Sequence, residues 1–599
     1  MNKRTMLNRL TGVFALVLAF ALAPYANAKD AAAPASGTSV TITILETSDI
    51  HGMIYPTDYA YGTPFDGGLA KAATVIKTER AKDPDLLLLD CGDSVQDNLI
   101  QEFRGDSIHP MIKAMNSLNY DAWELGNHEF NFEFSNLLKN IQSSRALVLA
   151  ANIYKKDGTR FVAPYIIKTV KGVRVAVVGL TAPHVPNWEA SNPEHFNNMT
   201  FTTPMDELGT ILPEILKKSD VIVVLAHYGQ DGEYDTDGMD TVAEKFGTQV
   251  AAFLIGHEHS TFAKKLDNGT VMVEPGVHGT AVGKVTLVMT RGTDSWQKTG
   301  ASAEILPVKN AGVEADKDML ALMKYVDEKS TAIAETVVGQ IGADFLPSLY
   351  WKDLPGIPAA VVEDTALIDL INTVQMKTTG ADVSLAALFD SSSNLTKGSF
   401  HKRDGVKVYK YDNTLMAVRV TGKQLKAIME QQAGNFFNTE KPGDVTISFN
   451  PAIRLYNYDM FAGVNYEINI SKPAGSRIEN VTYKGAPLAD DQVLTLALNN
   501  YRYGGLSKAG LISSRPDDLV YNSGLAVRDL ISDYVAKAGT LMPECDNNWS
   551  ITGIDCTVPG ADKIYDAVRG GKITIPQSQD GRTPNVASLN VNDYPEIVK

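Results

Sequence analysis

The chain has 599 residues, of which 44% are hydrophobic and 21% are charged, and its formal net charge is −15. This length and composition indicate a globular protein of two to four domains with ample apolar residues for a core. The acidic balance argues against a nucleic-acid polymer as the partner, because such proteins present a basic surface to phosphates. An anionic substrate would instead need local positive charge, from metal ions or from a few side chains.

Residues 1–28 are typical of a secretory signal peptide. Its basic start, apolar middle and A-x-A cleavage motif are Lys3, Arg4 and Arg9, then residues 10–23, then residues 26–28. The apolar run is shorter than a usual membrane span, and an uncleaved anchor helix is the alternative reading. We therefore expect cleavage after Ala28, export to the periplasm and no membrane anchor in the mature chain.

Three cysteines follow this segment. Cys91 comes after the apolar run "DLLLLD" and is expected to be a small buried residue without a nucleophilic role. Cys545 and Cys556 flank a loop-like stretch. Because exported proteins commonly form disulfides, these two cysteines are a possible pair.

Short apolar runs alternate with helix-period segments between residues 40 and 308. The strand-like runs are 40–46, 85–90, 174–180, 221–226 and 251–256, and two of the helical segments are 68–82 and 107–119. Buried strands that alternate with helices indicate a layered α/β domain. We expect a linker at 29–39, this domain at 40–308, a helical linker at 309–337, a second α/β domain at 338–560 and a polar C-terminal tail at 561–599.

Polar residues follow four of these apolar runs and a further short stretch, residues 122–125. They are Asp49 and His51, then Asp93, then Asn127 and His128, then His227, then His257 and His259. Each is weak evidence alone, since a single histidine after a strand is more often structural. Ligand sites in α/β sheets lie at the carboxyl ends of the strands, so we expect this set to converge at one edge.

The residue types in this set indicate a metal site. Carboxylate, imidazole and amide ligands suit divalent Zn, Mn, Co or Fe ions. Seven candidate ligands exceed the need of one tetrahedral ion, and two ions bridged by one carboxylate fit better. Such pairs activate water and hold a phosphoryl group for in-line displacement.

The motifs "SDIHG", "GD", "GNHEF", "AHYG" and "GHEH" resemble those of the calcineurin-like metallophosphoesterases, and specifically the secreted 5′-nucleotidase family. The resemblance implies a four-layer α/β/β/α first domain and a C-terminal α/β nucleotide-recognition domain. It implies Asp49, His51, Asp93 and His259 at one ion and Asp93, Asn127, His227 and His257 at the other, with Asp93 bridging. The family often has Gln where this chain has His259, which is also a competent ligand. His128 matches the family's catalytic histidine.

Two segments of the second domain, 409–425 and 496–505, resemble the family's nucleobase-binding segments. The resemblance implies that Tyr411 and Tyr501 stack on the base and that Asn413 contacts it. Two aromatic rings around a base give stacking that tolerates any base. The alternative is that these tyrosines only pack in the core or on the surface.

Two features differ from the 5′-nucleotidase branch of the family. That branch usually has Asp where this chain has Asn131, and it places phosphate-binding arginines in the second domain. Here residues 354–395 contain no Arg, and Lys377 is their only cation. Arg is the natural bidentate phosphate ligand, so the phosphate must be presented differently. Both features, and the longer stretches 107–132, 454–471 and 546–551, resemble the periplasmic 2′,3′-cyclic-nucleotide 2′-phosphodiesterase/3′-nucleotidases.

This resemblance implies two-metal hydrolysis of 2′,3′-cyclic nucleotides to 3′-nucleotides, and then of 3′-nucleotides to nucleosides. His128 would stabilise the developing charge, and Asn131 would orient His128 without adding charge. A neutral amide favours imidazolium less than a carboxylate does, so Asn131→Asp should raise the pKa of His128. We expect a monomer that acts on small-molecule nucleotides.

Three alternatives stay open. The first alternative is a 5′-nucleotidase or UDP-sugar hydrolase with unusual substrate contacts. The second is a sulfur-ester hydrolase, and the third is a non-catalytic nucleotide-binding module. A degraded enzyme should have lost ligands, and this sequence keeps all seven candidate ligands together with His128.

Overall fold

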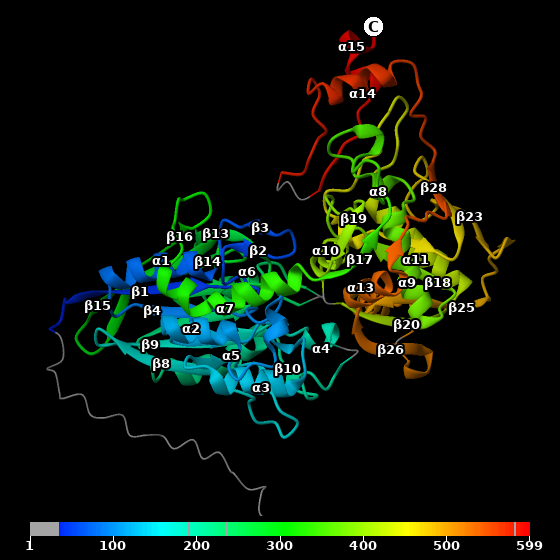
Figure 1. Cartoon of the computed structure of the whole chain (residues 1–599). Coiled ribbons are helices and arrows are strands. Elements are labelled where there is room, and N and C mark those ends of the chain that lie inside the picture. The colour runs from blue at the N-terminus through cyan, green and yellow to red at the C-terminus, as the bar shows by residue number, and fades with distance from the viewer. Residues whose placement is uncertain (1–34, 190–191, 234–235, 412, 514, 580–582) are drawn as a thin grey trace, which may run out of the picture.

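The computed structural model describes residues 35–599 except 190–191, 234–235, 412, 514 and 580–582. The predicted signal peptide therefore lies outside the described residues. The chain forms two lobes that lie side by side, joined through the long helix α7 (Lys317–Ala334) (Figure 1). Within the described residues, no helix combines the length and the hydropathy that crossing a bilayer requires.

Two six-stranded sheets pack face to face in the first lobe. The first sheet has the order β16-β15-β1-β4-β5-β6, and the second has the order β13-β14-β12-β11-β9-β8. The strands of the first sheet are β1 (Ser39–Thr47), β4 (Leu87–Asp90), β5 (Ala122–Glu124), β6 (Leu147–Leu149), β15 (Ala281–Arg291) and β16 (Trp296–Pro307). Those of the second are β8 (Tyr165–Val170), β9 (Val173–Thr181), β11 (Val221–His227), β12 (Ala252–Ile255), β13 (Thr261–Lys265) and β14 (Val271–Pro275).

The apolar runs form strands because both of their faces are buried. Successive side chains of a strand point to opposite sides of the sheet. In β1, Ile44 packs between the two sheets, whereas its neighbour Leu45 packs under the helices. In β4, Leu89 packs between the two sheets and Leu88 packs under the helices. Because the central strands β1, β4 and β5 are parallel, as are β9, β11 and β12, their carboxyl ends share one edge.

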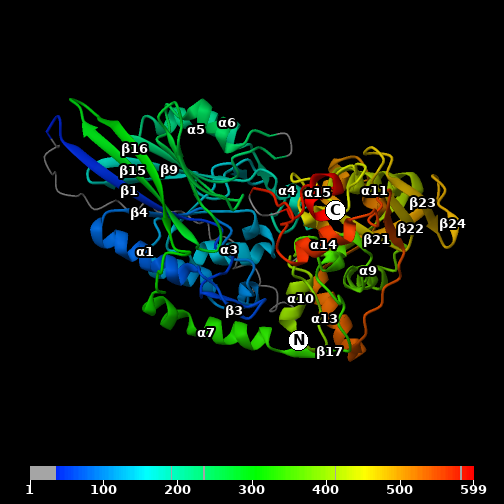
Figure 2. The ribbon, with the colours of Figure 1, turned by 90° about the horizontal axis from the view of Figure 1, so that it is seen from above.

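Helices cover the outer face of each sheet. The first sheet is covered by α1 (Leu69–Lys82), α2 (Pro110–Leu118), α3 (Phe134–Ser143) and α7. The second is covered by α5 (Pro204–Ile215) and α6 (Met239–Phe246). Figure 2 shows these two groups of helices on opposite sides of the paired sheets. The expected four-layer α/β/β/α order is therefore confirmed.

The second lobe is built on a five-stranded sheet of order β21-β18-β25-β20-β26. Its strands are β18 (Val383–Ala387), β20 (Thr414–Thr421), β21 (Asp459–Ala462), β25 (Val493–Asn499) and β26 (Leu519–Ala526). The helices of this lobe include α8 (Ala359–Val362), α9 (Ala366–Thr379), α10 (Lys402–Val408), α11 (Gly422–Phe436), α12 (Asn500–Lys508) and α13 (Val527–Ala538). The expected second α/β domain is thus confirmed.

Shorter elements complete the fold. Two small sheets in the second lobe contain β17 (Val337–Ile341), β19 (Gly398–His401) and β27 (Thr540–Leu541), and β22 (Asn465–Asn469), β23 (Ile478–Tyr483), β24 (Ala486–Pro487) and β28 (Trp549–Thr552). In the first lobe the short elements are β2 (Thr57–Asp58), β3 (Thr63–Pro64), β7 (Ile153–Tyr154), β10 (Thr200–Phe201) and α4 (Val185–Trp188).

Two segments contribute to the hydrophobic cores in addition to the roles expected for them as linker and tail. The predicted linker helix α7 packs Met319, Met323 and Val326 into the core of the first lobe. The segment expected as a polar tail forms α14 (Ala561–Arg569) and α15 (Pro595–Val598), and Ile564 and Tyr565 join the core of the second lobe. In α14 the polar residues lie on one face of the helix and the apolar residues on the other. Amino-acid composition alone does not show this division. The three cysteines are free thiols, with Cys91 buried.

Candidate functional site

The seven candidate metal ligands meet at the shared carboxyl edge of the two sheets. Their atoms form two groups, and within each group the ligand atoms lie within 4.8 Å of one another. The first group is Asp49, His51 and His259, and the second is Asp93, His227 and His257. Asn127 joins the second group, because its Oδ1 lies 3.1 Å from His227 Nε2 and 2.9 Å from His257 Nδ1.

The first group presents nitrogen and oxygen atoms to one point. His259 Nε2 lies 3.2 Å from His51 Nε2 and 3.4 Å from Asp49 Oδ1. Burial lowers the pKa of His51 to about 3, so this ring is neutral and keeps a lone pair. Two facing imidazole nitrogens beside a carboxylate form a donor set that suits a divalent cation.

The second group is oriented by contacts outside it. His227 Nδ1 lies 2.6 Å from the carbonyl oxygen of Cys91, which fixes this nitrogen as the donor and leaves Nε2 3.0 Å from Asp93 Oδ2. His257 Nε2 faces Glu233 Oε1 at 3.3 Å, so Nδ1 is the nitrogen that points at Asn127. A carboxylate or carbonyl partner on the far nitrogen is the usual arrangement for a metal-ligating histidine.

Asp93 lies between the two groups. Its Oδ2 is 3.0 Å from His227 Nε2 and 3.9 Å from His51 Nε2. Burial opposes ionisation of Asp93, but the neighbouring histidines hold its pKa well below the ordinary value. The residues therefore fit two cations that share one carboxylate.

Five of the seven candidate ligands have positive φ angles. These are Asp49 (51°), His51 (47°), Asp93 (55°), His257 (86°) and His259 (59°). Residues other than glycine rarely adopt this region, and such strain concentrates at functional sites. Backbone hydrogen bonds maintain it, including His51 N to Asp93 O at 2.9 Å and Asp49 N to Gly92 O at 2.9 Å.

The loops after β4 and β5 are joined by Glu129, which the sequence analysis did not single out. Its buried carboxylate accepts hydrogen bonds from the backbone N–H groups of Gly126 (2.7 Å), Asp93 (2.9 Å) and Ser94 (2.8 Å). Gly126 allows this close approach, since a Cβ atom there would lie 2.2 Å from Asp93 Oδ1. The only sequence signal was an acidic residue inside "GNHEF".

His128 lies beside the second group with its side chain one-third exposed. Nε2 is 3.9 Å from Asp93 Oδ2, and Nδ1 is 2.5 Å from Asn131 Oδ1. Burial opposes protonation, but the charge of Asp93 and the hydrogen bond to Asn131 outweigh it and hold the pKa of His128 above its ordinary value. The predicted contact between Asn131 and His128 is therefore present.

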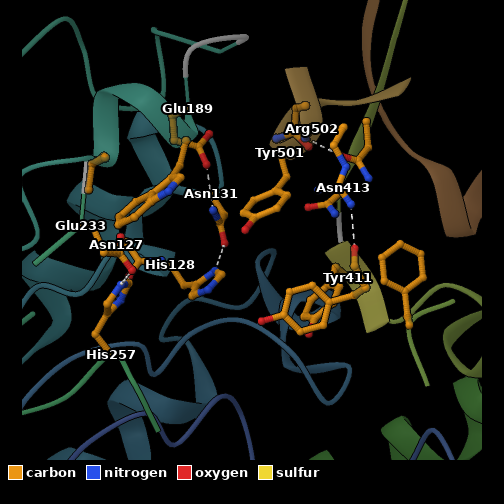
Figure 3. A pocket seen from close by; sticks show the side chains of 16 residues that line it. Asn127, His128, Asn131, Glu189, Glu233, His257, Tyr411, Asn413, Tyr501 and Arg502 are labelled. Atoms are coloured by element: carbon orange, nitrogen blue, oxygen red, sulfur yellow. Dashed lines mark hydrogen bonds and ion pairs between the residues drawn. The ribbon is translucent and has the colours of Figure 1, made fainter. Parts of the chain in front are cut away.

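A cavity of about 520 Å³ lies between the two lobes beside His128. Figure 3 shows Asn127, His128 and His257 at one end and Tyr411, Asn413 and Tyr501 at the other. Tyr501, near the start of α12, is 44% exposed and therefore available to a ligand. The structure brings the three predicted base-contact residues to the same cavity as His128.

Three aromatic residues of this cavity were missed. Tyr411 is held by Phe389 and Tyr456, whose ring centroids lie 5.7 and 6.2 Å from its own. Trp188 on α4 lies 5.4 Å from the ring of His257. Phe389 lies in the arginine-free stretch 354–395, and Tyr456 lies in the stretch 454–471. The spacing of these two residues from Tyr411 has no regular period that would predict a contact.

The positive charge of the cavity wall is already paired. Arg502 is the only Lys or Arg among the described lining residues. Its Nε lies 2.6 Å from Asp459 Oδ2, and its Nη2 donates to Asp459 Oδ1 at 2.9 Å. Among the described residues that line the cavity, the single guanidinium group is therefore already in an ion pair.

Comparison with known proteins gives consistent matches. Residues 42–261 match the calcineurin-like phosphoesterase family, and residues 352–510 match the 5′-nucleotidase C-terminal domain family. The chain is 28% identical over 606 residues to the 2′,3′-cyclic-nucleotide 2′-phosphodiesterase/3′-nucleotidase of Haemophilus influenzae, which covers 87% of this chain and 90% of that protein.

Two further matches extend the comparison. The trifunctional nucleotide phosphoesterase protein YfkN of Bacillus subtilis is 27% identical over 629 residues, which is 92% of this chain but only 42% of that protein. A crystal structure of a candidate 5′-nucleotidase from Staphylococcus aureus superposes with a TM-score of 0.73 and 26% identity, covering 86% of this chain and all of the other.

Proposed function

We propose a nucleotide-hydrolysing activity for this chain, which belongs to the two-domain 5′-nucleotidase family and joins a calcineurin-like phosphoesterase domain to a 5′-nucleotidase C-terminal domain. The proposed reactions are hydrolysis of 2′,3′-cyclic nucleotides to 3′-nucleotides and of 3′-nucleotides to nucleoside and phosphate. Relatives that carry this name at 27–28% identity over most of the chain support the proposal.

In the proposed site, Asp49, His51, Asp93 and His259 hold one divalent ion, and Asp93, Asn127, His227 and His257 hold the other. Zn²⁺, Mn²⁺, Co²⁺ or Fe²⁺ suits these donors. When bound, the two ions supply the Lewis acidity that binds phosphoryl oxygens and activates water for in-line attack. The dinuclear centre is a property of the family, and the donor geometry described above supports it here.

His128 is the proposed catalytic residue. Its Nε2 faces the metal groups, where it can donate a hydrogen bond to the charge that develops on the phosphoryl group or the leaving oxygen. Asn131 holds the opposite nitrogen.

Tyr411 and Tyr501 are the proposed stacking surfaces for the nucleobase, with Asn413 as a polar contact. The clustering of Phe389 and Tyr456 around Tyr411 supports a rigid aromatic wall on one side. Stacking of this kind contributes about 1–3 kcal/mol per base.

The observation that carries the choice of substrate is the paired state of Arg502. A 5′-phosphate held by second-domain arginines needs free guanidinium groups in the cavity, and among the described lining residues the one guanidinium is tied to Asp459. A phosphate on the 2′ or 3′ oxygen lies on the other side of the ribose and does not need that grip. The metal groups and His128 alone can then bind it.

The second candidate function is that of a 5′-nucleotidase or UDP-sugar hydrolase. Its support is the similarity to the S. aureus structure, which is described as a candidate 5′-nucleotidase. A non-catalytic nucleotide-binding module is a more remote alternative, and the complete ligand set argues against it. We also propose a periplasmic location, on the basis of the signal peptide predicted at residues 1–28.

The deciding experiment is an activity panel on the purified, metal-loaded protein with 2′,3′-cyclic AMP, 3′-AMP, 5′-AMP and a UDP-sugar. We expect higher kcat/KM for the first two substrates. A preference for 5′-AMP or the UDP-sugar would replace the proposal with the second candidate. Absence of hydrolysis on all four would favour the binding module.

A further inference from the structure

A chain of hydrogen bonds extends from His128 away from the metal groups. Asn131 Nδ2 donates to Glu189 Oε1 at 2.8 Å, and Glu189 Oε2 lies 3.0 Å from His195 Nδ1. The Glu189 side chain is only 6% exposed. Figure 3 shows Asn131 between His128 and Glu189, with its two bonds on opposite sides of the amide.

A carboxylate accepts hydrogen bonds and cannot donate them when ionised. Glu189 therefore attracts the NH₂ group of Asn131, which turns Oδ1 of the same amide toward His128. An oxygen at that place only accepts, so His128 Nδ1 must carry a proton. Nε2 then faces the metal groups and the cavity in one defined state.

We propose that Glu189 is a positioning residue that sets the amide orientation of Asn131 and, through it, the tautomer of His128. The inference rests on the proposed role of His128, and it explains the amide at position 131. The carboxylate belongs to Glu189, which contacts the amide of Asn131, and that amide in turn contacts the His128 ring. An amide is the side chain that can accept from imidazole on one side and donate to a carboxylate on the other.

The backbone places Glu189 for this task. It follows directly on α4, and its N–H donates to Val185 O at 2.9 Å to close the helix. The same helix carries Trp188 against His257. The end of α4 thus contacts both His257 and the partner of His128.

This arrangement changes the expected effect of Asn131→Asp. That substitution would place two carboxylates about 2.8 Å apart, where like charges repel and one must move or take up a proton. Glu189→Gln in the same chain removes that conflict, because the Gln amide can donate to the introduced carboxylate while that carboxylate accepts from His128 Nδ1. The two substitutions should therefore compensate each other.

The test is a double-variant cycle on the full-length, metal-loaded protein with bis-p-nitrophenyl phosphate and 2′,3′-cyclic AMP. Repulsion between two carboxylates in Asn131→Asp, and loss of the hydrogen bond to a charged group in Glu189→Leu, should each lower kcat by about ten- to hundredfold, with KM changed much less. Asn131→Asp/Glu189→Gln should recover to within a few-fold of wild type. Glu194→Gln, an exposed residue of the same loop, removes the same charge and should leave kcat unchanged.

A second readout does not depend on hydrolysis. In ¹⁵N-histidine spectra recorded at a pH where the His128 ring is neutral, with its signals assigned by their absence from His128→Gln, wild type should show the Nδ1–H tautomer and Glu189→Leu should lose it. The inference is overturned if the double variant is no more active than Asn131→Asp, or if Glu189→Leu keeps the Nδ1–H signal. If wild type hydrolyses none of the nucleotides, the proposed function fails, while the tautomer measurement still decides the role of Glu189.

Discussion

Gly126→Ala should disable the candidate metal site by moving Asp93. Gly126 has no positive φ, so its backbone conformation is open to alanine and only the added Cβ matters. That atom would lie 2.2 Å from Asp93 Oδ1, 2.5 Å from Asp93 N and 2.8 Å from Glu129 Oε2. The substitution therefore tests the placement of the proposed bridging carboxylate.

The size of the effect follows from these distances. Ordinary contacts of a Cβ atom begin near 3.4 Å, so the Asp93 oxygen must withdraw by about 1 Å. Metal–ligand distances are fixed to about 0.2 Å, and changes outside the ligand shell alone cost about 10- to 100-fold in affinity. We expect at least that loss of affinity, together with about 1–3 kcal/mol of destabilisation from overpacking.

The assay measures bound metal after dialysis against limiting Zn²⁺ or Mn²⁺, and the metal-induced rise in Tm. Wild type should hold two ions and gain Tm with metal, because a ligand that binds only the folded state stabilises it. The matched control is Gly209→Ala in α5, where an added Cβ meets nothing closer than 3.9 Å and should change stability by no more than about 1 kcal/mol. Unchanged metal content and affinity in Gly126→Ala would refute the bridging role of Asp93.

Three further predictions test other parts of the protein. Tyr501→Ala should lower kcat/KM for 3′-AMP by about 10- to 100-fold through lost stacking and leave kcat/KM for bis-p-nitrophenyl phosphate unchanged, with Tyr534→Ala as the control. Equal losses on both substrates would contradict stacking. Burial, with the charge of Asp364, raises the pKa of Asp369 to about 7, so folded-state stability should fall as pH rises from about 4 to about 7. Asp369→Asn should flatten that fall in a Tm series, and a wild-type slope in the variant would count against it. Thorough chelation should abolish hydrolysis and readdition of Mn²⁺ or Zn²⁺ restore it, whereas activity that survives chelation would exclude the two-metal site.

Five strands of the first lobe were predictable because short runs rich in apolar and β-branched residues mark them. The run at 221–226 is entirely apolar and became β11 (Val221–His227). The run at 40–46 contains two Thr and one Glu among its apolar residues and became β1 (Ser39–Thr47). The segment 561–599 was harder, because the sequence does not show which face of α14 is covered by the rest of the lobe.

For the site, the sequence identified the side chains with metal chemistry and their positions after strand ends. It did not identify Glu129 or Glu189, because an acidic residue in a loop has no local sign of being buried. Nor did it reveal that Arg502 is committed to Asp459, 43 residues earlier in the chain. Each of these contacts joins segments whose spacing in the sequence carries no regular period.

Residue types and their order along the chain are enough to predict the chemistry proposed for this protein. Strand ends that deliver Asp, His and Asn residues, the "GNHEFN" motif and the stretch without arginine follow from residue type and local order. The tertiary structure decided what those residues do to each other: Gly126 lets Asp93 approach, Phe389 and Tyr456 hold Tyr411, and Glu189 orients the amide of Asn131. The reason is physical, because burial and hydrogen-bond partners depend on atoms brought together across the two sheets and the two lobes, and no local pattern specifies them.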